Sequence, residues 1–64
     1  MTNYKIYLTN DANVDTIHMK AHGYEVKENT TEFYVNTYNA KGKVVDTDVV
    51  LEVFNKHIVY IQKM

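Results

Sequence analysis

The fold is decided by a valine-rich stretch near the C-terminus, VVDTDVVLEVF at positions 44–54. Every second residue of this stretch is β-branched or leucine: Val45, Thr47, Val49, Leu51 and Val53. The residues between them are mostly polar, as a strand with one buried face requires. β-Branched side chains also fit a pleated sheet better than a helix. The stretch therefore predicts a long strand with its odd-numbered residues turned inward. A helix over residues 48–57 is the competing interpretation.

Two shorter alternating segments lie near the N-terminus, over residues 4–9 and 16–21. Their inward-facing positions are Tyr4, Ile6, Leu8, Ile17, Met19 and Ala21. The asparagine- and aspartate-rich residues 10–15 between them predict a turn. The next predicted inward residues stand at even positions of the sequence, whereas the earlier ones of the second segment stand at odd positions. One extra residue must therefore be accommodated at His22 and Gly23. We therefore expect a β-bulge there, with Gly23 in the left-handed conformation and a sharp bend in the strand.

Turn residues divide the rest of the chain into further strands. Residues 29–31 and 39–42 predict hairpin turns, with Gly42 in the left-handed conformation, and residues 55–57 predict a short 3₁₀ turn. Five strands with short connections predict a single all-β domain over residues 1–64: a small five-stranded antiparallel barrel or strongly bent sheet, similar to the SH3 or Sm arrangement. The alternatives are an open meander paired with its copy, and an α+β fold with a helix at residues 48–57.

Composition narrows the classes of protein that the chain can belong to. It has 64 residues and no cysteine, so neither disulfides nor thiolate metal sites can stabilise its small core. We therefore expect a homodimer, formed through a strand edge or a tyrosine-bearing face. Seven lysines and eight acidic residues give a net charge of −1, which disfavours a dedicated nucleic-acid binder. Without a signal peptide or an apolar run of ~20 residues, we expect a cytoplasmic protein with no membrane contact.

Two patterns are similar to metal-binding motifs. Residues 11–15 open like a calcium-binding loop, but the positions that need glycine and glutamate hold Thr16 and His22. His18 and His22 have the spacing that pairs zinc ligands on a helix, yet they fall on a predicted strand. We therefore expect no metal and no cofactor.

Asp46, Asp48 and Glu52 form a predicted acidic face on the valine-rich strand. Paired carboxylates can share a proton or bind a cation, but no nucleophile or phosphate-binding loop accompanies them. A solvated face that discourages pairing between strand edges is the simpler explanation. We therefore expect no catalytic residue, and a local mimic of DNA charge is a variant function for this face.

The outward-facing tyrosines are the best candidates for binding residues. Tyr7, Tyr34 and Tyr38 alternate with predicted core residues, and tyrosine is favoured at the centres of protein interfaces. Interleaved with lysines, the same side chains could stack on single-stranded bases. The balanced charge favours a protein partner.

Residues 23–26 (GYEV) and 53–61 (VFNKHIVYI) resemble the small β proteins encoded by phages and prophages of low-GC Gram-positive bacteria. The resemblance implies a single-domain cytosolic accessory protein, and some phage proteins of this size inhibit host enzymes or defence systems by binding them. We therefore expect a non-enzymatic interaction protein that binds and inhibits a host protein, such as a defence or nucleic-acid-processing enzyme. A nucleic-acid-binding small β-barrel is the alternative.

Overall fold

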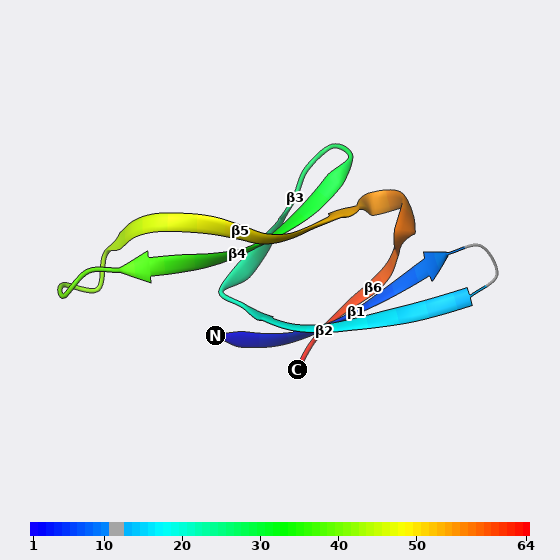
Figure 1. The fold of residues 1–64 in the computed structure, drawn as a ribbon, viewed down its shortest axis with the longest axis horizontal. Coiled ribbons are helices and arrows are strands. Elements are labelled where there is room, and N and C mark those ends of the chain that lie inside the picture. The colour runs from blue at the N-terminus through cyan, green and yellow to red at the C-terminus, as the bar shows by residue number, and fades with distance from the viewer. Residues whose placement is uncertain (11–12) are drawn as a thin grey trace.

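The computed structural model describes residues 1–10 and 13–64, in which all regular structure is β-strand apart from one 3₁₀ turn. The strands form two three-stranded antiparallel sheets (Figure 1). Sheet A has the order β2-β1-β6 and contains β1 (Thr2–Asn10), β2 (Asn13–Ala21) and β6 (Ile58–Lys63). Sheet B has the order β3-β4-β5 and contains β3 (Gly23–Val26), β4 (Thr30–Tyr38) and β5 (Val44–Phe54). The all-β prediction is confirmed, but the described strands form two open sheets and not a closed barrel.

The chain passes between the two sheets at two places. One is the bend at His22, which separates β2 from β3, and the other is η1 (Asn55–His57), which joins β5 to β6 (Figure 1). The predicted bend and the predicted 3₁₀ turn are therefore confirmed. The alternative of a helix over residues 48–57 is wrong, because β5 remains a strand as far as Phe54. The predicted turn and calcium-like loop include residues 11–12, which lie outside the described part of the chain.

Gly23 has a different role from the one predicted. Of the two glycines, only Gly42 has a positive φ, 78°, as its predicted hairpin position requires, so Gly23 is not in the left-handed conformation. Gly23 pairs with Tyr34 across β3 and β4, and a Cβ at Gly23 would lie 2.5 Å from the Tyr34 hydroxyl oxygen. The tyrosine ring covers the glycine, an arrangement that protects a glycine in a strand, and the ring would have to move to admit a side chain at this position.

A small core holds the two sheets together. Its buried apolar residues are Tyr4, Ile6, Ala21 and Phe33, contributed by both sheets. The Tyr4 ring packs edge-on against Phe33, with ring centroids 5.5 Å apart. Partly buried residues surround this centre: Leu8, Ile17, Met19, Leu51 and Ile61. The predicted inward faces of the two N-terminal segments are thus confirmed.

The predicted alternation of β5 is interrupted twice. Two residues of β5, Val45 and Val50, have no direct partner in the β4 ladder and form bulges. Each bulge reverses which residues face the core, and only Leu51 and Val53 of the predicted inward set are partly buried. All of residues 44–50 are exposed. The prediction that this half of the strand has a buried face is wrong, because no second sheet lies against it.

The outer part of β4 and β5 extends away from the core as a two-stranded arm, which we define as residues 34–50 (Figure 1). The Cα atoms span 48 × 24 × 13 Å and have a radius of gyration of 13.2 Å. A compact domain of this length has a radius of gyration of about 11 Å. The accessible surface is 4701 Å², whereas a folded chain of this size exposes about 4,200 Å². The arm accounts for the elongated shape.

Candidate functional site

One face of the arm carries aromatic and aliphatic side chains. Tyr34 pairs with Val49 across the two strands, and Tyr38 pairs with Val44. Three of these side chains are about half exposed: Tyr38 (49%), Val44 (50%) and Val49 (52%). We call these four residues the tyrosine face. The exposed apolar side chains gathered here make this face a candidate surface for interaction.

Hydrogen bonds hold the middle of the tyrosine face in place, where Asn36 pairs with Thr47. The Thr47 hydroxyl donates to Asn36 Oδ1 at 2.8 Å, and the Asn36 backbone N–H donates to His22 Nδ1 at 2.8 Å. The His22 ring also packs edge-on against Tyr38, with centroids 5.4 Å apart. His22 directly precedes β3, and its imidazole accepts a hydrogen bond from the backbone of β4 at this point. His18 lies in the other sheet, and the described residues contain no group of three side chains suited to holding a metal ion.

The predicted acidic face is divided by the bulge at Val50. Asp46 and Asp48 lie on the side of the arm that continues the core face of sheet B, whereas Glu52 lies on the opposite side, next to the tyrosine face. The Asp46 carboxylate accepts a hydrogen bond from the Thr47 backbone N–H at 2.9 Å. We call the side of the arm with both aspartates the aspartate face, formed by Val35, Thr37, Asp46 and Asp48.

Glu52 instead belongs to a row of three glutamates across sheet B. Glu32 of β4 pairs with Glu25 of β3 on one side and with Glu52 of β5 on the other. Like charges directly opposite each other destabilise a sheet. Lys27 Nζ lies 3.1 Å from Glu32 Oε1 and offsets part of this repulsion. The hydrogen bond to Glu32 and the charge of that carboxylate raise the pKa of Lys27. The sequence does not indicate this row, because it depends on the strand register.

The outer face of sheet A carries lysines and tyrosines. Tyr7 and Tyr60 pair across β1 and β6, with ring centroids 5.9 Å apart. The Tyr7 hydroxyl donates to Gln62 Oε1 at 3.1 Å, and Lys5 Nζ lies 5.1 Å from the centre of the Tyr7 ring. Tyr7 is therefore on a different sheet from Tyr34 and Tyr38, and the structure does not bring the three predicted tyrosines together.

Lysines on two adjacent strands complete this surface. Lys5 of β1 pairs with His18 of β2, and Lys20 lies two residues further along β2, on the same side. Asp15, the acidic residue of β2, pairs with Leu8 on the core side instead. We call the outer surface the lysine face: Lys5, Tyr7, His18, Lys20, Tyr60 and Gln62. Among the described residues of sheet A, no carboxylate lies on it.

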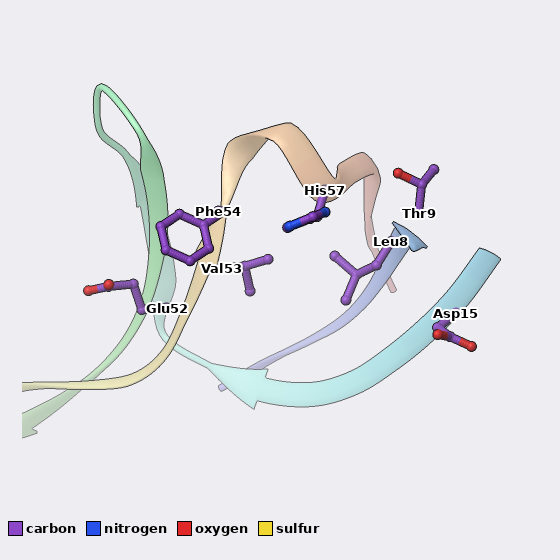
Figure 2. Close-up of a pocket in the computed structure, with 7 residues that line it drawn as sticks. All are labelled: Leu8, Thr9, Asp15, Glu52, Val53, Phe54 and His57. Carbon is purple, nitrogen blue, oxygen red and sulfur yellow. The ribbon is translucent and has the colours of Figure 1, made fainter. Parts of the chain in front are cut away.

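A cleft of about 330 Å³ lies where β5 turns through η1 towards β6. Leu8, Val53 and Phe54 form its apolar walls, and the His57 ring lies between them (Figure 2). Glu52 and Asp15 occupy opposite ends of the cleft (Figure 2). Its volume is near the lower limit of small-molecule sites, which is about 300 Å³. Within the described residues, no ion pair joins His57 to either carboxylate of the cleft.

No protein-family model, curated protein or solved structure matches the chain. Within residues 1–10 and 13–64, no helix has the length and apolar character that crossing a membrane requires. The class of protein that the fold defines is therefore a small all-β domain made of two open sheets. Its function has to be inferred from the surfaces of the arm and of sheet A.

Proposed function

We propose that the protein is a non-enzymatic binding module that attaches to another protein through the tyrosine face of its arm. The observation that carries this proposal is the exposure of Tyr38, Val44 and Val49 together on a projecting hairpin. Two-stranded arms with apolar side chains lose water-exposed surface only when something packs against them. The strands fix the backbone of this face, so binding orders few additional residues.

The energetics of the tyrosine face suit a protein partner. Burying a valine fully is worth about 1.5–3 kcal/mol, and a tyrosine contributes a large contact area with little conformational freedom to lose. Charged side chains flank the face, with lysines at positions 41 and 43 near the tip of the arm and Glu52 at its base. The hydrogen-bonded Asn36–Thr47 pair lies between the two tyrosine–valine pairs, so the face combines apolar, polar and charged side chains, as protein interfaces commonly do.

The resemblance to phage and prophage proteins adds the origin of the partner to this proposal. The partner would be a protein of the bacterial host, such as a defence or nucleic-acid-processing enzyme, and binding would inhibit it. An arm that reaches away from its own core suits this role, because it can enter a groove or cover a site that a compact domain of the same size would not reach.

Nucleic-acid binding is the second candidate, and the lysine face is the observation that favours it. Tyr7 and Tyr60 lie side by side there with Lys5 and Lys20, and exposed aromatic rings can stack on unpaired bases. The five other lysines are spread over the connection between β3 and β4, the tip of the arm, η1 and the end of β6. This scattered distribution and the absence of arginine from the sequence place nucleic acid second.

The test compares two double variants, each of which changes two exposed valines. Val44→Ser with Val49→Ser changes the tyrosine face, whereas Val26→Ser with Val59→Ser changes exposed valines elsewhere. Tagged proteins are used to capture partners from a lysate of the source cell or host, and partners are identified by mass spectrometry. We expect one captured protein whose affinity falls about tenfold or more in the arm variant, equal to about 1.4 kcal/mol, and is unchanged in the control.

A parallel titration with single- and double-stranded oligonucleotides separates the two candidates. Protein binding through the tyrosine face should depend weakly on salt, because charge contributes little to it. Binding to nucleic acid falls steeply as salt rises, since each phosphate contact releases counterions. Tight, salt-sensitive oligonucleotide binding that is lost with Lys5→Ala and Lys20→Ala, but kept with the arm variant, would replace the proposal with the second candidate.

A further inference from the structure

The aspartate face of the arm is an uncovered continuation of the core face of sheet B. Close to the core, sheet A lies over this side of β4 and buries Phe33 completely. Further along the same side, Thr37 and both aspartates are exposed, because sheet A ends before the arm does. Neither Asp46 nor Asp48 takes part in an ion pair within the described residues. This surface therefore lies on the side of sheet B that is buried near the core, but it is exposed to solvent.

The lysine face has the opposite charge and is also unpartnered. Lys20 is exposed and Lys5 is partly exposed. Tyr60, on the edge strand β6, is 58% exposed. No ion pair within the described residues involves either lysine. The chain therefore carries an acidic surface on its arm and a basic surface on the outside of sheet A, each without a partner of opposite charge.

The spacing of the charges on the two surfaces also agrees. Asp46 and Asp48 are two residues apart on one strand, which places them about 6.6 Å apart along it. Lys5 and Lys20 are diagonal neighbours on two paired strands, a separation of about 7–8 Å. Two carboxylates can therefore face two ammonium groups at the same time, without distortion of either sheet.

We propose that the aspartate face of one copy docks on the lysine face of a second copy, and that two copies exchange arms about a two-fold axis. Every copy carries one of each surface, so both contacts form together and close the dimer. An exposed ion pair contributes only about 0–1 kcal/mol. The affinity therefore comes from covering the apolar parts of the two faces, Val35 on the arm and the rings of Tyr7 and Tyr60 on sheet A, and the charges fix the register.

Pairing of two β5 edges is the other way in which the arm could form a dimer, and its charges disfavour it. In regular antiparallel registers centred on any residue from 46 to 50, one carboxylate of Asp46, Asp48 or Glu52 lies directly opposite another. Such contacts are repulsive. The same aspartates that prevent edge pairing are attracted to the lysine face, so the arrangement favours exchange of arms. The tyrosine face stays free in this dimer, so the inference goes beyond the proposed function.

The proposal is tested by reversing the charges of one face at a time. We expect the wild-type protein to sediment as a dimer at high micromolar concentration, with an affinity that weakens as salt rises. The variant Asp46→Lys with Asp48→Lys, and the variant Lys5→Asp with Lys20→Asp, should each be monomeric, with dimer dissociation constants about tenfold or more above that of the wild type. All four side chains are at least partly exposed, so circular dichroism should show both variants folded.

Mixing the two charge-reversed variants gives the decisive measurement. In the mixed pair, each basic arm meets an acidic face and each acidic arm meets a basic face, so a heterodimer should form from two monomers. Control substitutions Glu28→Lys with Lys56→Glu reverse exposed charges outside both faces and should leave the dimer intact. A wild-type monomer, a dimer that survives either reversal, or a mixture that stays monomeric would overturn the proposal. None of these outcomes alters the test of the tyrosine face, which reads capture of a different protein.

Discussion

The sheet junction and the arm are built from similar sequences and end in opposite environments. At the junction, alternating residues of β1, β2 and β4 bury Ile6, Ala21 and Phe33 completely between two sheets. In the arm, residues 44–50 alternate in much the same way, and all of them are exposed. The strand pattern is thus sufficient to form a hydrogen-bonded ribbon in both regions. Burial needs a second layer, and the chain supplies that layer only at the junction.

This difference also separates the residues that stabilise the fold from those available for binding. Side chains at the junction contribute to folding because they leave water when the sheets meet. The arm valines stay in water in the isolated chain, so they add little to its stability. A surface that contributes little to folding while exposing apolar groups is suited to recognition. Substitutions in the two regions should therefore have effects of very different size.

The largest contrast is expected between Phe33 and Val49. Phe33→Ala removes a completely buried ring from the contact with Tyr4 and should lower the free energy of unfolding by about 3–5 kcal/mol. For so small a domain, this loss is enough to unfold the protein. Val49→Ala, at a position 52% exposed, should change the free energy by less than about 0.5 kcal/mol. Urea denaturation followed by circular dichroism measures both.

Equal destabilisation by the two substitutions would show that Val49 is buried in solution, as it would be in a dimer formed through the tyrosine face. Repeating the denaturation at several protein concentrations distinguishes that case, because the stability of a dimer rises with concentration. A neutral Phe33→Ala would contradict the assignment of the core.

Much of the secondary structure follows from the sequence, because strands and turns depend on local patterns. The strand over residues 44–54, the bend at His22 and the turn over residues 55–57 all appear where they were predicted. The left-handed conformation of Gly42 was also predicted. The same conformation was wrongly assigned to Gly23. The change of parity at this position arises because the chain passes to the other sheet, and the Tyr34 ring occupies the space of a side chain at Gly23.

The arrangement of the surfaces could not be predicted from local patterns, because it depends on the register between strands and on the extent of each sheet. The bulge at Val50 separates Glu52 from Asp46 and Asp48, and no residue type in the stretch marks it. Tyr34 and Tyr38 were correctly predicted to share a face, since both lie on one strand. Tyr7 was separated from them because the chain forms two sheets, where one barrel was expected.

A smaller contrast is expected between two threonines that make the same kind of hydrogen bond. Thr31 is buried at the junction and donates to Asn55 Oδ1 at 2.6 Å, while Thr47 is exposed on the arm and donates to Asn36. Thr31→Val should lower the free energy of unfolding by about 1–3 kcal/mol, because an acceptor near the core loses its donor. Thr47→Val should cost less than about 0.5 kcal/mol, since water replaces the lost partner.

The comparison of these two valine variants is sharpened by Asn55. Its side chain also donates to the Lys27 carbonyl at 2.9 Å and so ties η1 to the connection between β3 and β4. In a double-mutant cycle, Thr31→Val and Asn55→Ala should be strongly non-additive, because both remove the same bond. Additive effects would mean that the stabilisation by the Thr31 hydroxyl does not come from its hydrogen bond to Asn55.

The smallest effect is expected at the glutamate row, which lies where the junction passes into the arm. Glu52→Gln removes one of two like-charge contacts with Glu32, and should raise the free energy of unfolding by about 0.2–1 kcal/mol. The gain should shrink as salt is added, because ions screen the repulsion. Substitution of Lys27 by Gln should have the opposite sign, since it leaves Glu32 without its ion pair. The pKa of Lys27 is raised in the folded state above its ordinary 10.5, so this stabilisation is fully present below pH 10.5 and is lost as the pH rises through the folded value. Denaturation curves of both variants at neutral and strongly alkaline pH measure these effects. A Glu52→Gln variant that is less stable than the wild type at low salt would show that the carboxylate is attracted to a cation, and would contradict the repulsive row.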